Sequence, residues 1–285
     1  MIRRAACAAV LIVVLTACGG HGGSSQSKDL VVGATSDPQS IVLANLYAAA
    51  LRYFGTPAHA EVVADPLAAL DAGKVDVVPG LTGRLLQTFA PGATARSDEQ
   101  VYKAMVGALP EGITVGDFTT AAEDKPAVAV ADATATAWGG RDLTSLVGHC
   151  AQVRPGARKD AQIPTAIGSC KLSPPRQFAD SAALFAALRA GEINAAWTST
   201  ADPAMSDAPQ GLVVLTDRKP MLIQAENAVP LYRRNELNPQ QVLALNQIAG
   251  ALDTAGLKQM RQKVIAGADP RAVADAWLAD NPLGR

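Results

Sequence analysis

The stretch Ala69-Leu70-Asp71-Ala72-Gly73-Lys74-Val75-Asp76-Val77-Val78 organises this chain, because the chain repeats it. The second copy is Ala187-Leu188-Arg189-Ala190-Gly191-Glu192-Ile193-Asn194-Ala195-Ala196. Each copy predicts the end of an apolar helix, a glycine that closes the helix in a left-handed conformation, and a short buried strand. Two such units favour two α/β lobes of similar construction, although two unrelated helix–glycine–strand units would produce the same pattern.

Small and polar residues follow each predicted strand. They occupy positions 79–83 after the first copy, 197–200 after the second, and 34–36 between strand 30–33 and the next helix. In open α/β sheets, ligands bind outside the carboxyl ends of the strands. A helix N-terminus next to such an end suits a polar or anionic ligand group. We therefore expect these backbone N–H and hydroxyl groups to line one cleft between the lobes.

Composition limits the classes of function. The chain has 285 residues, enough for one large domain or two of ordinary size. Hydrophobic residues make up 49% of it, which excludes a disordered chain. The formal net charge is −1 and no run of basic residues occurs, so nucleic acid is not an expected partner.

The N-terminal segment predicts export and anchoring. Two arginines precede the apolar run 5–15, which is shorter than the roughly 20 residues that span a bilayer. Residues 1–17 are therefore predicted to be a signal peptide. Leu15-Thr16-Ala17-Cys18 resembles the bacterial lipobox, in which the cysteine carries the lipid; an ordinary secretory signal is the alternative. The Gly/Ser-rich residues 18–28 predict a flexible, lipidated tether.

The cysteines agree with export. Cys7 leaves with the signal peptide and Cys18 carries the lipid, so Cys150 and Cys170 remain. Outside the cytosol two such cysteines are expected to pair, and two free buried thiols are the alternative. A disulfide here would close a loop rich in Pro and Gly and would stabilise it by about 3 kcal/mol in the chain-entropy model.

Helix starts and lobe boundaries follow from local signals. Asp or Asn before Pro predicts a helix start, because the first residue caps the helix and proline suits its first position. Ser97 with Gln100 predicts a capping box. After the strand predicted at 128–130 we expect the chain to cross into lobe 2, and near Asn227 to return. The Asp/Asn-Pro starts are Asp37, Asp65, Asn238 and Asp269. The predicted boundaries are 29–131 and 229–285 for lobe 1 and 132–228 for lobe 2.

Motifs of catalysis are not found. His59 and His149 stand alone, without the spacing of zinc ligands. No nucleophile elbow, phosphate loop or dinucleotide fingerprint occurs. Asp71 and Asp76, beside the first glycine turn, are predicted to be solvated. The sequence thus predicts a binding protein that is not an enzyme and that uses no metal and no cofactor.

Several segments, taken in order, carry a family resemblance. They are Gly33-Ala34-Thr35-Ser36-Asp37-Pro38-Gln39, residues 69–83, Thr198-Ser199-Thr200-Ala201-Asp202, Leu215-Thr216-Asp217-Arg218-Lys219 and Asn227-Ala228-Val229-Pro230. With them the chain resembles the substrate-binding proteins of osmoprotectant (glycine betaine/choline type) ABC transporters, and it looks closest to actinobacterial lipoproteins of the LpqZ type. The resemblance implies two α/β lobes joined by two crossover strands, the fold of type II periplasmic binding proteins.

The chain departs from the family pattern at positions where the family has ligand-binding residues. The resemblance implies an aromatic box that holds a quaternary ammonium group by cation–π contacts of about 0.5–2 kcal/mol each. Leu81 stands where the family has tyrosine, Gly80 replaces its acidic neighbour, and Pro126 replaces a second tyrosine. Only Trp138 and Trp197 lie near plausible cleft positions. A neutral polyol, a sugar or an amino-acid-like ligand fits a hydroxyl-rich lining as well.

The expected ligand-binding residues come from the strand ends and from the resemblance. Trp138 is placed either in the cleft or in the core, and Asn227 either contacts the ligand or pins the hinge. The full set is Thr35, Ser36, Asp37, Gly80, Leu81, Thr82, Trp138, Thr198, Ser199, Thr200 and Asn227.

These observations lead to one functional interpretation with alternatives. The chain is expected to be a monomeric lipoprotein, anchored at the outer face of the cytoplasmic membrane, that captures a small polar solute between its lobes. It would then deliver the solute to an ABC permease. An envelope sensor or scaffold that keeps the fold is the first alternative, and an envelope hydrolase is the second. Replacement of Thr82 and Thr200 by valine is expected to abolish lobe closure while the protein still folds.

Overall fold

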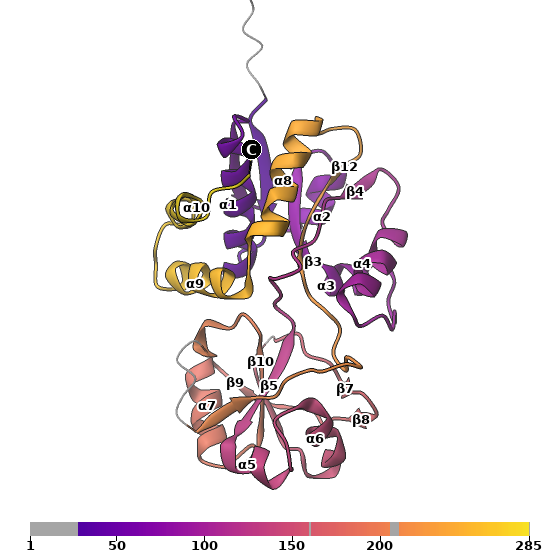
Figure 1. Ribbon diagram of the computed structural model, residues 1–285, viewed down its shortest axis with the longest axis vertical. Helices are drawn as coiled ribbons and strands as arrows, with labels where there is room; N and C mark the ends of the chain where they lie inside the picture. Colours follow the sequence, from indigo (N-terminus) through magenta and orange to yellow (C-terminus); the bar gives the residue numbers. More distant parts are fainter. Residues whose placement is uncertain (1–27, 160, 206–210, 285) are drawn as a thin grey trace, which may run out of the picture.

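The computed structural model describes residues 28–159, 161–205 and 211–284. Within these ranges the chain forms two α/β lobes, drawn one above the other in Figure 1. The predicted signal peptide and the lipid-bearing Cys18 lie outside the described residues. The described helices include none that is long and apolar enough to cross a bilayer.

Lobe 1, the upper lobe in Figure 1, is built on a five-stranded sheet of order β2-β1-β3-β12-β4. Strands β1, β2 and β3 run parallel, and β12 runs antiparallel to both of its neighbours. The strands are β1 (Leu30–Ala34), β2 (Ala58–Val62), β3 (Val77–Leu81), β4 (Ile113–Val115) and β12 (Ala228–Arg233). The helices are α1 (Pro38–Tyr53), α2 (Pro66–Asp71), α3 (Thr82–Phe89), α4 (Asp98–Gly107), α8 (Pro239–Ala251), α9 (Thr254–Ile265) and α10 (Pro270–Asp280).

Helix α1 is the centre of the lobe 1 core. It is apolar on most of its surface, and Leu46, Tyr47 and Leu51 are completely buried. The C-terminal helices α8, α9 and α10 also pack against it. A helix that is hydrophobic nearly all round must be covered on all sides, so the chain returns to lobe 1 to complete this core.

Lobe 2, the lower lobe, has a second five-stranded sheet of order β11-β5-β10-β6-β9. Its strands are β5 (Pro126–Ala131), β6 (Pro155–Arg158), β9 (Arg176–Phe178), β10 (Ala195–Ser199) and β11 (Leu212–Val214), with a separate hairpin of β7 (Ala166–Ile167) and β8 (Cys170–Lys171). Its helices are α5 (Asp132–Ala137), α6 (Leu143–Gly148) and α7 (Ser181–Arg189), with short 3-10 turns η1 (Cys150–Gln152) and η2 (Pro203–Met205).

The predicted helix starts are confirmed at the Asp/Asn-Pro pairs. In α1, α2, α8 and α10 the capping side chain accepts a hydrogen bond from a backbone N–H group of the first turn. Such caps contribute about 0.5–2 kcal/mol each. Helix α4 also begins where it was predicted, but the Ser97 side chain makes no capping bond, so the predicted capping box is not formed.

The internal repeat is a structural repeat. Gly73 follows the helix of the first unit with φ 71°, and Gly191 follows the helix of the second with φ 72°, both in the left-handed region. Each unit is a helix, this glycine and a buried strand, α2 with β3 and α7 with β10. Residues 79–81 and 197–199, however, lie within strands rather than in turns, and Thr82 is the first residue of a helix.

One polar residue of each repeat ties its strand to the neighbouring parallel strand. The Asp76 carboxylate accepts from Val31 N at 2.9 Å, and Asp76 N donates to Val31 O. Asn194 repeats both bonds with Arg154, its Oδ1 accepting from Arg154 N at 2.7 Å. The prediction that Asp76 is solvated was therefore wrong: its side chain is buried, because the strand register needs its carboxylate.

The first crossing between the lobes differs from the prediction. Strand β5 pairs antiparallel with β10 and β11 in the second sheet, so the chain enters lobe 2 before Pro126 rather than after Ala131. The apolar run 127–130 would suit a buried strand of either sheet, and its pairing with β10 and β11 places it in lobe 2. The return crossover runs beside the first one, with Glu123 and Asn227 paired as an antiparallel bridge.

The predicted disulfide is confirmed. Cys150 and Cys170 are bonded, with their Cα atoms 5.5 Å apart. The bond joins the turn after α6 to strand β8 and encloses residues 151–169. Residues 161–166 of this loop face lobe 1 across the cavity between the lobes.

Candidate ligand-binding cleft

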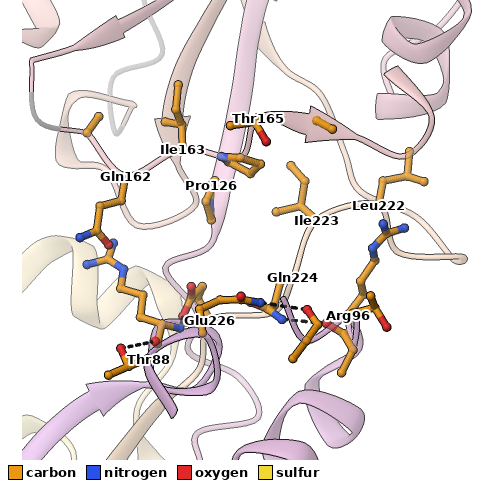
Figure 2. Close-up of a pocket in the computed structure, with 18 residues that line it drawn as sticks. Thr88, Arg96, Pro126, Gln162, Ile163, Thr165, Leu222, Ile223, Gln224 and Glu226 are labelled. Carbon is orange, nitrogen blue, oxygen red and sulfur yellow. Dashed lines mark hydrogen bonds between the residues drawn. The ribbon is translucent and has the colours of Figure 1, made fainter. Parts of the chain in front are cut away.

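A cavity of about 1010 Å³ lies between the two lobes. Figure 2 shows Gln162, Ile163 and Thr165 of lobe 2 across the cavity from Thr88 and Arg96 of lobe 1. The return crossover forms a third side. The lining residues are Arg84, Gln87, Thr88 and 93–96 from lobe 1, Pro126 and 161–166 from lobe 2, and 222–224 with Glu226 from the crossover.

Amide side chains hold the lobe 1 side of this cavity to the crossover. Gln87 Nε2 donates to Ala93 O at 2.9 Å and to Gln224 Oε1 at 3.2 Å. Gln224 Nε2 donates in turn to Ala95 O at 2.9 Å. Helix α3, the loop 93–96 and the crossover are thus linked, and this side is preformed.

Two arginines with exposed side chains line this cavity. Arg84 lies in the first turn of α3, and Arg96 ends the loop before α4. Both side chains are exposed, and neither guanidinium group forms an ion pair with any part of the chain that the structure describes. Unpaired guanidinium groups are ready donors for an anionic or polar ligand.

Glu226 is the acidic residue of the lining. It is buried, and its Oε2 accepts from Arg84 N at 3.0 Å. The carboxyl therefore takes the capping position of α3, where Leu81 offers no side-chain acceptor. Gly83 makes room for it, because a Cβ atom there would lie 2.8 Å from the Glu226 Cδ atom. Burial raises the pKa of Glu226 to about 7, although the hydrogen bond from Arg84 N and the Arg84 charge oppose the shift.

Thr82 and Asn227 join the return crossover to lobe 1. Thr82 is fully buried, and its Oγ1 accepts from Asn227 N at 3.1 Å. Asn227 Nδ2 donates to Thr119 O at 2.8 Å and to Ala122 O at 3.3 Å, both on the first crossover. Neither Thr82 nor Asn227 lines the interlobe cavity. Their contacts join the return crossover to helix α3 and to the first crossover. Whether Asn227 also contacts a ligand stays a prediction.

The predicted lobe 2 residues lie at the hinge as well. Thr200 Oγ1 accepts from Lys125 N at 3.1 Å and donates to Glu123 O at 3.0 Å. Thr198 Oγ1 donates to Asp202 at 2.9 Å. Neither they nor Ser199 line the interlobe cavity. Lobe 2 contributes residues 161–166 instead, a segment without periodicity that sequence patterns did not point to.

A second cavity, of about 420 Å³, opens at the carboxyl ends of β1 and β3 in lobe 1. It shares Arg84 and Thr88 with the interlobe cavity, so the two are neighbours. Gln39, 4% exposed, lines it and has an unpaired Nε2 donor. Four residues of the predicted set line this cavity, as the strand-end argument expects: Thr35, Asp37, Gly80 and Leu81. Ser36 is exposed nearby and is not part of the lining.

The tryptophans near the predicted cleft belong to the lobe 2 core. Trp138 is 7% exposed, and its ring stacks on His149 at a centroid distance of 5.8 Å. Trp197 is buried in the same cluster. Of the described residues that line either cavity, none is aromatic. Trp138 thus takes the core position, the second of the two that the sequence allowed.

The two histidines of the described ranges have separate surroundings. Within those ranges, no three His, Cys, Asp or Glu side chains gather closely enough to hold a metal ion. His59 contacts Asp29 at the surface of lobe 1, and His149 Nδ1 lies 2.9 Å from Ser145 O inside lobe 2.

Solved structures of similar fold are substrate-binding proteins. The chain matches apo YehZ from Escherichia coli with a TM-score of 0.67 and 19% identity, over 89% of this chain and 98% of that one. It matches a glycine betaine/carnitine/choline ABC transporter protein with a TM-score of 0.71 and 15% identity, over 88% and 98%. Lactococcal OpuAC, closed on glycine betaine, matches with a TM-score of 0.54 and 12% identity, over 89% and 96%.

These matches show the two-lobe fold of periplasmic binding proteins that the sequence predicted. No curated protein sequence matches the chain at a significant level. A family model provides the assignment. Because residues 28–280 match the model described as the substrate binding domain of ABC-type glycine betaine transport systems, the chain belongs to that family of solute-binding proteins.

Proposed function

We propose that this protein captures a small polar solute between its lobes and delivers it to an ABC permease, without a catalytic step. The observation that carries the proposal is the interlobe cavity, which takes lining residues from both lobes and from the return crossover. A ligand that contacts all of them favours the closed arrangement of the lobes, because only that arrangement makes every contact at once.

The paired crossovers supply the hinge for this closure. They run side by side through the Glu123–Asn227 bridge, and the hydroxyl groups of Thr82 and Thr200 fasten their ends to the lobes. Each lobe has its own sheet, and the core clusters belong mainly to one lobe each, with Ala201 of lobe 2 packed into the lobe 1 cluster beside α9. Rigid lobes on two short connections are the construction in which a hinge rotation leaves the lobe interiors unchanged.

The proposal includes a lipid anchor at the cell envelope. The lipobox-like Leu15-Thr16-Ala17-Cys18 supports it, as does the resemblance to actinobacterial lipoproteins of the LpqZ type. The tether 18–28 would hold a monomer close to the membrane and its permease. Radiolabelled palmitate incorporation and membrane fractionation test the anchor: wild type should be labelled and membrane-bound, and Cys18→Ala should be neither.

The character of the cavity favours transport over a sensor or scaffold with an apolar, wedge-open cleft. Guanidinium, amide and hydroxyl groups line it together with aliphatic side chains. Native mass spectrometry of the gently purified protein should find a small polar solute that is lost on denaturation. Small-angle scattering should show a smaller radius of gyration when that solute is restored. A protein that carries no solute, and stays open with every solute offered, would contradict the proposed function.

A further inference from the structure

Building on the proposed function, we infer that the cleft is made for a small hydroxylated solute that carries a carboxylate or phosphate group. Arg84 and Arg96 would hold the oxyanion. A quaternary ammonium cation would not be the preferred ligand. Three features of the described lining support this ligand: its positive charge, its lack of aromatic side chains, and its hydroxyl and amide groups.

The charge of the interlobe cavity is positive. Its described lining contains two arginines, one glutamate and no lysine, aspartate or histidine. The glutamate is Glu226, whose carboxyl is turned to the N-terminus of α3 and is buried there. Both guanidinium groups are exposed, and neither has a carboxylate oxygen within 4.0 Å among the described residues, although the charge of Arg84 also acts on the buried Glu226 carboxyl. An incoming oxyanion would therefore find free, forked donors that match its geometry.

The acidic residues of the neighbouring lobe 1 cavity do not reverse this sign. Asp37 and Asp65 line that cavity. Both carboxylates cap helices, Asp37 accepting from Gln39 N and Ser40 N and Asp65 from Ala68 N. Their charge thus faces the positive ends of α1 and α2. Arg84 borders both cavities, so a ligand that reaches into either one passes this guanidinium group.

A quaternary ammonium group lacks its usual partners here. Such a group cannot donate a hydrogen bond and is held by aromatic faces. The two cavities are free of aromatic side chains in the described lining, and Leu81 and Pro126 occupy it instead. Trp138 and Trp197 are buried in the lobe 2 core and do not reach the cleft.

Hydroxyl and amide groups complete the lining. Thr88, Thr94 and Thr165 supply hydroxyl groups, and the Gln162 amide points from lobe 2 towards lobe 1 in Figure 2. Neutral groups of this kind exchange hydrogen bonds with ligand hydroxyls. The cavity of about 1010 Å³ is large enough for a solute with several hydroxyl groups beside its oxyanion.

Calorimetry on the mature, full-length protein tests the inference. The probes are gluconate, citrate, glycerol 3-phosphate and inorganic phosphate on one side, and glycine betaine and choline on the other. A hydroxylated anionic probe should bind and close the lobes. Arg84→Gln and Arg96→Gln should each weaken that binding by about tenfold or more, and added salt should weaken it further. The matched control, exposed Arg189→Gln on α7, should bind like wild type.

Other outcomes overturn the inference in distinguishable ways. Binding of glycine betaine or choline that both cleft variants leave unchanged refutes the anionic ligand but keeps the proposed function. Anion binding that both variants leave unchanged removes Arg84 and Arg96 from the site. If no probe binds and the protein carries no anionic solute when purified, the inference fails. Circular dichroism of both variants should match wild type, because both side chains are exposed. Thermal unfolding of Arg96→Gln should match as well, whereas Arg84→Gln loses the charge that opposes the raised pKa of Glu226, so its stability is compared with wild type at each pH used for binding.

Discussion

Replacement of Glu226 by glutamine should change how stability depends on pH. Burial raises the Glu226 pKa from its ordinary value of 4.5 to about 7 in the folded protein. Between these two values the folded state binds the proton more tightly than the unfolded state does. Stability therefore falls as the pH rises through this window: the contribution is fully present below pH 4.5 and is lost above pH 7.

The size of the effect follows from the same numbers. Each pH unit in the window changes the free energy of unfolding by about 1.4 kcal/mol, so the whole contribution is about 3 kcal/mol, most of which is lost between pH 5 and pH 8. The Glu226 side chain is almost completely buried, so solvent screening reduces this little. In Glu226→Gln the amide oxygen still accepts from Arg84 N, and the neutral amide does not titrate.

Urea denaturation at pH 5, 6, 7 and 8, followed by far-UV circular dichroism, measures the difference. The free energy of unfolding of Glu226→Gln, relative to wild type, should rise by about 2–3 kcal/mol from pH 5 to pH 8. Exposed Glu111→Gln is the matched control and should run parallel to wild type. A difference between wild type and Glu226→Gln that stays constant over this range would refute the argument that Glu226 is buried and protonated near neutral pH.

Three further variants test the crossover contacts and the lobe 2 loop. Thr82→Val should cost about 1–3 kcal/mol in urea denaturation, because Asn227 N loses its buried acceptor; full stability with altered binding alone would contradict this reading. Gly83→Ala should cost about 1–3 kcal/mol and weaken the Glu226 cap, since the new Cβ would lie 2.6 Å from a crossover carbonyl; a thermal midpoint equal to wild type would count against it. Cys150→Ala with Cys170→Ala should cost about 3 kcal/mol, and a calorimetric scan that is unchanged would show that the disulfide adds nothing.

The hinge contacts change what is expected of the threonines. From the sequence, Thr82 and Thr200 were predicted to bind ligand, so that valine would leave folding intact. In the structure both hydroxyl groups hold backbone atoms of the crossovers. Their replacement is therefore expected to act on stability first. Whether either residue also touches the ligand in a closed form stays a prediction.

Sequence patterns were most successful where the signal is local. The Asp-Pro helix starts, the glycines at 73 and 191, and the apolar strands depend on residues within one or two turns of each other. Such signals are readable without knowledge of the partner elements. They led to the starts of α1, α2, α8 and α10, to the strands that follow the two glycines, and to two α/β lobes. They also led to the strand-end residues Thr35 and Gly80 that line the lobe 1 cavity.

The interlobe site was less predictable because its residues come from irregular segments. Arg96 and the segment 161–166 have no periodicity that marks them, and Glu226 looked like any polar residue before Asn227. The boundary of lobe 2 was also misplaced, since the run 128–130 reads as a strand in either sheet. Only the pairing of β5 with β10 decides between them.

The sequence by itself therefore determined the repeated helix–glycine–strand units, the helix caps and the cysteine pair, since each depends on neighbours along the chain or on the compartment. Tertiary structure decided the rest. It buried Asp76, which was expected to be solvated and instead ties strand β1, and it buried Glu226, which caps α3. It also left Arg84 and Arg96 exposed in the cleft. The cleft joins segments that are more than one hundred positions apart, such as α3 and Glu226, and no local sequence pattern records such contacts.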